Sequence, residues 1–224
     1  YFGSYHTGAI ALRRRAAASN LPPGVAIRGA TADDLPQLGA FLDRIGPARQ
    51  FFPCHRQTDW FQDAATFRGL LAEDILLACR GGEIIGSLGC WDQSSFRQIV
   101  VEAYGPALAL SAPLYNGWAA LRGSPKLPKP GESLRFLTTA LPVVAGNDRN
   151  IFAALLEAAL ARSVGRGWSH LLVGMHESDP LLDVVKHFQT EAYLTRCYLV
   201  YWDDGVALRR QIDGRTPYLE LGCL

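Results

Sequence analysis

The bend between an apolar stretch and a helix, "VVAGNDRNIF", holds residue types that could bind an anion. Backbone N–H groups at a helix N-terminus, with the positive end of the helix dipole, form a site for phosphate. Glycines usually let the backbone close around the phosphate. Six other residues occupy this bend: Asn147, Asp148, Arg149, Asn150, Ile151 and Phe152. Arg149 adds a positive charge. The alternative is that Asn147 or Asp148 caps the helix and Phe152 fills the core.

Other reactive residue types give weaker patterns. Cys54 lies beside His55, but adjacent side chains rarely face one another in a regular element, and no third group of a catalytic set is evident. The histidines and cysteines also lack the spacing of metal ligands. We therefore predict no metal site and no thiol nucleophile.

Composition limits the possible classes of protein. The 224 residues are 49% hydrophobic, which is enough for one substantial core. The 22 Lys and Arg residues nearly balance the 21 Asp and Glu residues, which argues against a nucleic-acid partner. Five cysteines without paired spacing indicate reduced thiols and a cytoplasmic location. Prolines and glycines interrupt the longest apolar stretch, so we expect no membrane span.

The elements that must position these residues follow from hydrophobic periodicity and turn residues. "DILLACRGGEIIGSLGCWD" predicts a hairpin turning at Gly81 and Gly82. A helix from about 148 to 165 connects predicted strands at 135–144 and 170–176, so these strands should be parallel. We also expect them to be splayed apart. Further expected elements are a strand at "VAIRGA", a helix at "LPQLGAFLDRIG", a helix near 62–72, a short helix over "DPLLDVVKHF", and a closing hairpin of "AYLTRCYLVYWDD" with "TPYLELGCL".

This order resembles the Gcn5-related N-acetyltransferases (GNAT superfamily), as a divergent member. "VAIRGATADDLPQLGAFL" is similar to their opening strand and helix, "CRGGEIIGSLG" to their central hairpin, and "FAALLEAALARSVGRGWSHLLVGM" to the helix and strand after their coenzyme A loop. The resemblance implies an α/β fold with a mixed, mainly antiparallel sheet flanked by helices. It covers residues 25–224, with an insertion at about 94–133. Residues 1–24 are interpreted as an N-terminal extended segment or the remnant of an upstream domain.

The resemblance implies that acetyl-CoA or another acyl-CoA is the acyl donor. Its pyrophosphate would be held by a loop of pattern Gln/Arg-x-x-Gly-x-Gly/Ala, which is degenerate here at both glycine positions. Asn150 tolerates a left-handed backbone, whereas the ring of Phe152 would crowd a phosphate unless it turns inward. The preceding strand would align the pantetheine. The implied cofactor-binding residues are Leu141, Val143, Val144, Asn147, Asp148, Arg149, Asn150, Ile151 and Phe152.

The family's chemistry also needs a base, and the resemblance places His176 and Glu177 at the open end of the sheet. Histidine has a suitable ordinary pKa for that role, and Glu177 could orient it or bind an amine. The alternative is an ordinary capping turn before the helix at Asp179 and Pro180. In many relatives a tyrosine protonates the departing thiolate. Tyr193 is the candidate here, although the family's Tyr-x-x-x-Gly-Phe pattern is missing.

The acyl acceptor would lie beside the second hairpin strand in such a protein. There, Trp91 and Asp92 are candidate substrate-binding residues, because the Asp92 carboxylate could receive an ammonium group. The alternative is that Asp92 caps a following helix, with Ser94 and Ser95 in its first turn.

The expected function is therefore transfer of an acyl group from acyl-CoA, or from an acyl carrier protein if the pyrophosphate loop is lost, to an amine of a small molecule or peptide. The alternative is a non-catalytic GNAT-like domain that binds a ligand or acts as a scaffold and has lost CoA binding. A homo-oligomer is a further possible assembly.

The insertion carries more apolar surface than a solvated connection needs. We predict that its large side chains pack as a lid over the acceptor side of the sheet, with "GSPKLPKPGE" as the exposed return. A structural flap or a dimer contact is the alternative. The residues of the predicted lid are Tyr104, Leu108, Leu110, Leu114, Tyr115 and Trp118.

Overall fold

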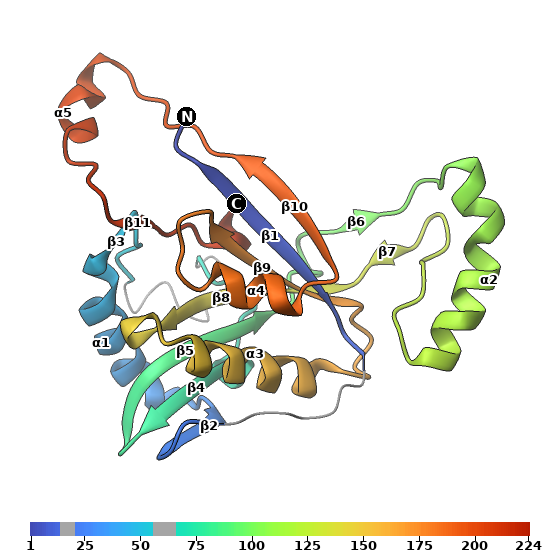
Figure 1. Cartoon of the computed structure of the whole chain (residues 1–224), viewed down its shortest axis with the longest axis horizontal. Helices are drawn as coiled ribbons and strands as arrows, with labels where there is room; N and C mark the ends of the chain where they lie inside the picture. The colour runs from blue at the N-terminus through green and yellow to red at the C-terminus, as the bar shows by residue number, and fades with distance from the viewer. Residues whose placement is uncertain (14–20, 56–65) are drawn as a thin grey trace.

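A seven-stranded mixed sheet forms the centre of the molecule (Figure 1). The computed structural model describes residues 1–13, 21–55 and 66–224. The strand order is β10-β1-β9-β8-β5-β4-β2, with β8 and β9 parallel and the other neighbours antiparallel. These strands are β1 (Ser4–Ala11), β2 (Val25–Gly29), β4 (Ile75–Arg80), β5 (Glu83–Trp91), β8 (Phe136–Val144), β9 (His170–His176) and β10 (Glu191–Arg196). The predicted α/β fold with a mainly antiparallel sheet is confirmed.

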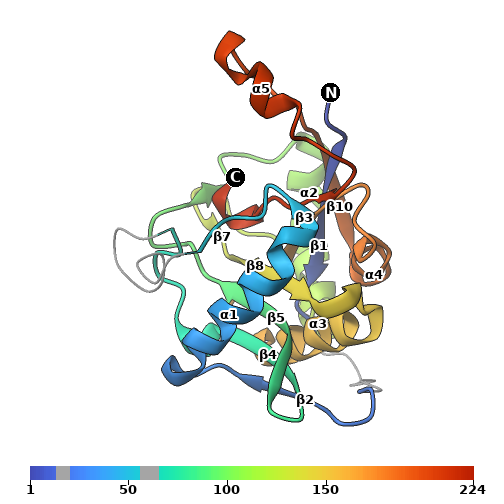
Figure 2. The same ribbon diagram turned by 90° about the vertical axis from the view of Figure 1, so that its left-hand side faces the viewer.

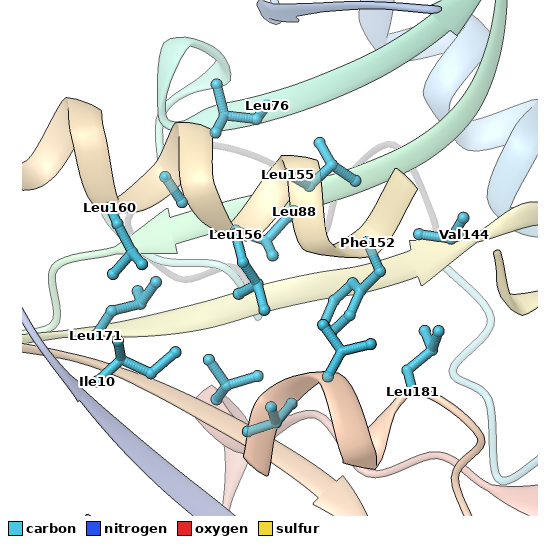
Figure 3. Close-up of a cluster of buried hydrophobic side chains, with 14 of the residues drawn as sticks. Ile10, Leu76, Leu88, Val144, Phe152, Leu155, Leu156, Leu160, Leu171 and Leu181 are labelled. Atoms are coloured by element: carbon cyan, nitrogen blue, oxygen red, sulfur yellow. The ribbon is translucent and has the colours of Figure 1, made fainter. Parts of the chain in front are cut away.

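Helices on opposite faces of the sheet create two apolar cores (Figures 1 and 2). On one face, α3 (Arg149–Ser163) and α4 (Leu182–Phe188) cover the larger core, where Phe152 packs beside Val144 and Leu156 (Figure 3). On the other face, α1 (Leu35–Ile45) buries Leu38, Phe41 and Leu42, which recur at helical spacing. Each helix thus contributes one apolar side to a core.

The predicted hairpin is confirmed as β4 and β5. Gly81 and Gly82 form its turn with φ angles of 57° and 86°, which glycine adopts without a steric penalty. The helix predicted at 148–165 is α3, and the strands before and after it are parallel, as expected. The helix predicted near 62–72 falls partly outside the described residues, and its described part includes only a turn and the start of a 3₁₀ helix at Ala72–Asp74.

The two ends of the chain differ from the sequence prediction. β1 lies within the sheet, between β9 and β10, so the sheet begins well before Val25. The predicted closing hairpin is wrong. β10 pairs with β1, whereas β11 (Thr216–Pro217) pairs in parallel with β3 (Arg49–Gln50). Local sequence gave no sign of these distant partners.

The insertion forms an arm rather than a lid. It contains β6 (Ile99–Val100), α2 (Pro106–Arg122) and β7 (Ser133–Leu134), and α2 stands apart from the sheet (Figure 1). Leu110 and Leu114 are 84% and 81% exposed. The prediction that these apolar residues pack over the sheet is therefore wrong. Within the described residues, no helix is long and apolar enough to cross a membrane.

Candidate functional site

The parallel strands β8 and β9 separate partway along their length. They pair only from Phe136 to Thr138, opposite His170 to Leu172, although both strands continue beyond that point. Leu141 then adopts a left-handed backbone with φ of 52°, and Pro142 has no N–H to offer a neighbouring strand. A bulky residue at positive φ is unusual and points to a locally imposed constraint. The strands are thus splayed, as predicted.

The backbone of Leu141 turns its two polar groups toward different partners. Its carbonyl oxygen accepts a hydrogen bond from the Ser87 hydroxyl at 2.9 Å, on the β5 side. Its N–H donates to the Glu220 carboxylate at 2.9 Å. The opening between β8 and β9 therefore contains a backbone donor that already holds a carboxylate oxygen.

The C-terminal tail, residues 216–224, occupies this opening. The tail begins with β11, which pairs with β3, and the Tyr218 N–H donates to the Gln50 carbonyl at 2.8 Å. The Tyr5 hydroxyl donates to the Leu219 carbonyl at 2.9 Å. The last 3₁₀ turn of the tail, Leu221–Cys223, lies against β8 and β9. The remaining cavity is only about 10 Å³, and it is lined by Tyr5, Pro142, Gly174, Met175, His176, Asp179, Tyr218 and Leu219.

Glu220 is an acid buried in this tail, with 7% of its surface exposed. The Tyr218 hydroxyl donates to the same carboxylate oxygen as the Leu141 N–H, at 2.7 Å. No cation forms an ion pair with Glu220 within the described part of the chain. Burial raises its pKa to about 7, against the lowering effect of these two hydrogen bonds.

This raised pKa predicts a pH-dependent stability. The folded pKa of Glu220 lies above the ordinary value of 4.5, so its contribution is complete below about pH 4.5 and is lost as the pH rises through about 7. The free energy of unfolding should fall by roughly 3 kcal/mol across that range because of this group. Urea unfolding at about pH 5 and about pH 8 should reveal the loss, and Glu220→Gln should lack this component. An equal pH dependence in both proteins would contradict the assignment.

The N-terminus of α3 is capped by its own chain. The Asp148 carboxylate accepts from the N–H groups of Asn150 at 2.9 Å and Ile151 at 3.2 Å. The guanidinium of Arg149 turns to Asp183, at 3.0 Å. These N–H groups are the ones a pyrophosphate would use, and the capping carboxylate would repel it. The residues present do not fit a CoA pyrophosphate.

The other predicted cofactor-binding residues lie mostly in the cores. Val143, Val144, Ile151 and Phe152 are at most 3% exposed, and Phe152 turns into the core rather than toward the loop (Figure 3). Asn147, and not Asn150, has the left-handed backbone, with φ of 52°.

A buried ion pair borders the opening. Arg49 forms a salt bridge with Asp179, and each side chain is 5% exposed. Arg49 also donates to the Asn147 side-chain oxygen at 2.7 Å, and its guanidinium lies 5.9 Å from the Tyr218 ring centroid. This network joins the α3 loop, the end of β9 and the tail. Sequence reasoning considered Asp179 only as part of a capping turn.

His176 lies at the end of β9 beside the opening, but both ring nitrogens have partners. The Ser178 N–H donates to Nδ1 at 3.2 Å, which leaves the ring proton on Nε2, 2.8 Å from the Phe2 carbonyl. Glu177 is exposed, and its N–H donates to the Ser4 carbonyl. The N-terminal residues thus cover His176.

The remaining predicted site residues lie elsewhere. Tyr193 is 58% exposed on β10, and β1 separates that strand from β9. Trp91 is buried, and its indole N–H donates to the Arg68 carbonyl at 2.8 Å. The Asp92 carboxylate accepts from the Ser94 N–H at 3.0 Å and the Trp168 indole at 2.9 Å. Burial raises the pKa of Asp92, but these hydrogen bonds outweigh it, and the net shift is downward.

The residues that sequence reasoning missed are Tyr5, Tyr218 and Glu220. The signal available was a single acid in "TPYLELGCL", an otherwise mainly apolar segment. An acid between buried residues is expected to have specific partners, although the sequence could not identify them. No group of side chains suited to holding a metal ion occurs among the residues that the structure describes.

Comparisons with known proteins return structures rather than sequence families. No protein-family profile matches the chain, and no curated protein matches it. One similar structure is a fungal multi-domain GH3 β-N-acetylglucosaminidase with a GCN5-related glucosamine N-acetyltransferase region. It is 15% identical, with a TM-score of 0.46, over 86% of this chain and 20% of that one. A GCN5-related N-acetyltransferase from Sphaerobacter thermophilus is 14% identical, with a TM-score of 0.48, over 85% and 50%.

A third similar structure is an aminoglycoside acetyltransferase from an uncultured soil metagenomic sample, in complex with trehalose. It is 16% identical, with a TM-score of 0.43, over 80% of this chain and 96% of that one. The chain thus spans only a fifth of the first structure and half of the second. The seven-stranded sheet contains the parallel β8–α3–β9 unit that the sequence predicts. With TM-scores below 0.5, these likenesses carry no argument about fold or activity.

Proposed function

We propose that this chain is an N-acyltransferase that moves an acyl group from a pantetheine thioester to an amine, with the thioester between β8 and β9. The supporting observation is the Leu141 N–H, which holds a Glu220 carboxylate oxygen at 2.9 Å. Acyl transfer is accelerated by a fixed donor about 2.7–3.1 Å from the developing oxyanion. The Glu220 oxygen therefore stands in for the thioester oxygen of the donor.

In the proposed reaction, the amine nitrogen attacks the thioester carbonyl carbon. A C–N bond forms, the C–S bond breaks, the amine loses a proton to a base, and the thiolate takes up a proton. The Leu141 N–H stabilises the oxygen that becomes negative. His176 remains the proposed base, but Phe2 must first move away and the ring proton must shift to Nδ1, beside the Ser178 hydroxyl, so that Nε2 can accept the amine's proton. The Tyr5 hydroxyl, which hydrogen-bonds within the opening, is a nearer candidate for the thiolate's proton donor than Tyr193.

The capped N-terminus of α3 affects which acyl donor the chain would bind. The Asp148 carboxylate already accepts hydrogen bonds from the N–H groups of Asn150 and Ile151, so these groups do not favour binding of a pyrophosphate. Acyl-CoA therefore has little advantage in affinity over a donor that lacks a pyrophosphate. An acyl carrier protein presents the same pantetheine arm and needs no pyrophosphate site. We therefore favour a carrier-bound thioester over acyl-CoA. The amine acceptor, a small molecule or peptide, remains part of the proposal.

Release of free thiol from acetyl-CoA and from S-acetylpantetheine, with and without an amino sugar or a peptide amine, tests this function. We expect amine-dependent release from both donors, with affinities within about tenfold because the pyrophosphate contributes little. Much tighter binding of acetyl-CoA would show that the α3 loop does bind phosphate. No binding and no release with either donor, even when the tail is displaced, would overturn the acyltransferase proposal.

That last outcome would favour a second function, a non-catalytic domain of the same fold. The observation in its favour is that the chain's own residues occupy both places where the acyl donor would bind. The Asp148 carboxylate caps the N-terminus of α3, and the tail fills the opening between β8 and β9.

A further inference from the structure

The contacts of the tail differ from those of the sheet around it. Beyond the two-residue pairing of β11 with β3, the described contacts include no strand ladder between the tail and β8 or β9. It is held instead by single hydrogen bonds, from Leu141 to Glu220, from Tyr5 to Leu219, and from Gln93 to the Gly222 carbonyl at 2.7 Å, and by the buried Tyr218 ring, which packs against Phe52. Each such bond contributes only about 1 kcal/mol net. Apart from β11, the tail therefore lacks the continuous hydrogen-bond ladder that fixes each strand of the sheet.

The sheet does not need the tail to stay paired. β8 is hydrogen-bonded along its length to β5, and β9 is hydrogen-bonded along its length to β1. The chain that leads into the tail, from Cys197 to Arg215, is largely exposed and extends away from the sheet with α5 (Val206–Arg209) (Figures 1 and 2). This exposed connection is long enough for the tail to leave the opening while β8 and β9 keep their hydrogen-bonded partners.

The buried Glu220 carboxylate also weakens docking. A carboxylate without an ion pair is costly to remove from water, and two hydrogen bonds offset only part of that cost. An apolar side chain at this position would carry no such penalty. Glu220 instead offers a carboxyl oxygen to the Leu141 N–H, the same interaction that a thioester oxygen would make under the proposed function.

From these contacts we propose that the C-terminal tail is a displaceable plug: residues 216–224 occupy the thioester site between β8 and β9, and a pantetheine thioester binds only when they leave. This inference rests on the proposed acyltransferase function. Donor and tail then compete for the Leu141 N–H and for the space between the strands. The apparent affinity for the donor is reduced by the fraction of molecules in which the tail is docked.

Release of the tail should depend on pH. The titratable groups near Glu220 are Tyr218, Tyr5 and Cys223, and burial raises the pKa of all three. Their charges therefore stay fixed around neutral pH. The other charged or titratable groups bordering this site are Arg49, Asp179 and His176, which have the hydrogen-bond partners described above. Ionisation of Glu220 with rising pH makes docking less favourable, so the tail should open more above about pH 7.

Gly222 offers a way to displace the tail without deleting it. A side chain there would collide with the Trp91 ring, whereas a side chain at Gly214 meets no atom within 4 Å. Gly222→Val should therefore push the tail out, and Gly214→Val is the matched control. Hydrogen exchange measured by mass spectrometry reports tail opening directly, through residues 216–224 and the Leu141 amide.

The experiment measures binding of S-acetylpantetheine by titration calorimetry, together with hydrogen exchange, in the full chain and both variants. We expect Gly222→Val to exchange faster in the tail and to bind at least about tenfold more tightly, with Gly214→Val like the parent chain. Faster tail exchange with unchanged, measurable affinity would overturn the plug and leave the acyltransferase function standing. No binding by any protein, with the tail shown to be open, would overturn the proposed function itself.

A measurement on the parent chain covers the case in which Gly222→Val fails to fold. Saturating S-acetylpantetheine should speed exchange in residues 216–224 and slow it at the Leu141 amide, because competition between tail and donor is reciprocal. Binding that leaves tail exchange unchanged, or slows it, would contradict displacement.

Discussion

Phe152→Ala is expected to lower the free energy of unfolding by about 3–5 kcal/mol. The ring is completely buried in the larger core, among Val144, Leu155 and Leu156, and its removal leaves a cavity that α3 and β8 are too firmly packed to close (Figure 3). Chemical unfolding in urea, followed by circular dichroism, gives the difference from the midpoint and slope.

Two further variants test whether the loss of stability comes from the burial of the Phe152 ring. Leu121→Ala, at a side chain that is 90% exposed on α2, should change stability by less than about 0.5 kcal/mol. Phe152→Leu retains much of the apolar volume and should cost clearly less than the alanine variant. If Phe152→Ala proved as mild as Leu121→Ala, the ring would not be in the core, and a position facing the α3 loop, where it would crowd a phosphate, would have to be considered.

Arg49→Met is expected to destabilise the protein by about 3–5 kcal/mol, because it leaves the buried Asp179 carboxylate without its cation. One remaining described bond to that carboxylate comes from the Leu181 N–H at 2.9 Å, which cannot neutralise the charge. Adding Asp179→Asn should recover a substantial part of the loss. A double-mutant cycle in urea then measures the coupling energy of the pair.

The exposed pair of Arg149 and Asp183 is the matched control. Its atoms are 3.0 Å apart, but the side chains are 55% and 64% exposed. Arg149→Met should therefore cost less than about 1 kcal/mol. Equal losses for Arg49→Met and Arg149→Met would mean that Arg49 is solvated in solution and that the network beside the opening does not exist.

The sequence predicts those parts of the structure that are determined by residues close to one another in the chain. Gly81 and Gly82 between two apolar runs predicted the hairpin, and the periodic leucines and alanines after Asp148 predicted α3. Asp148 was considered as a cap from its position alone, and it does cap the helix. The parallel pair β8 and β9 followed from the helix between them.

The tail could not be predicted because its partners are far away in sequence. Glu220 binds Leu141, which lies 79 positions earlier, and Asp179 pairs with Arg49 across 130 positions. The apolar content of α2 was correctly recognised, but composition carries no information on the direction in which an arm extends. Apolar surface indicates that a partner is favoured, not which one. The predicted homo-oligomer therefore stays a prediction.

The position of β1 sets the order in which the molecule can be completed. Tyr5 pairs with His176, 171 positions later in the sequence, and Ser4 pairs with Arg196. During synthesis β1 leaves the ribosome long before β9 and β10 have been made, so it stays unpaired until then. The half-sheet of β2, β4, β5 and β8 involves shorter loops and can form earlier. Closure of β9 and β10 around β1 is then the slow step, and the opening that receives the tail exists only after it.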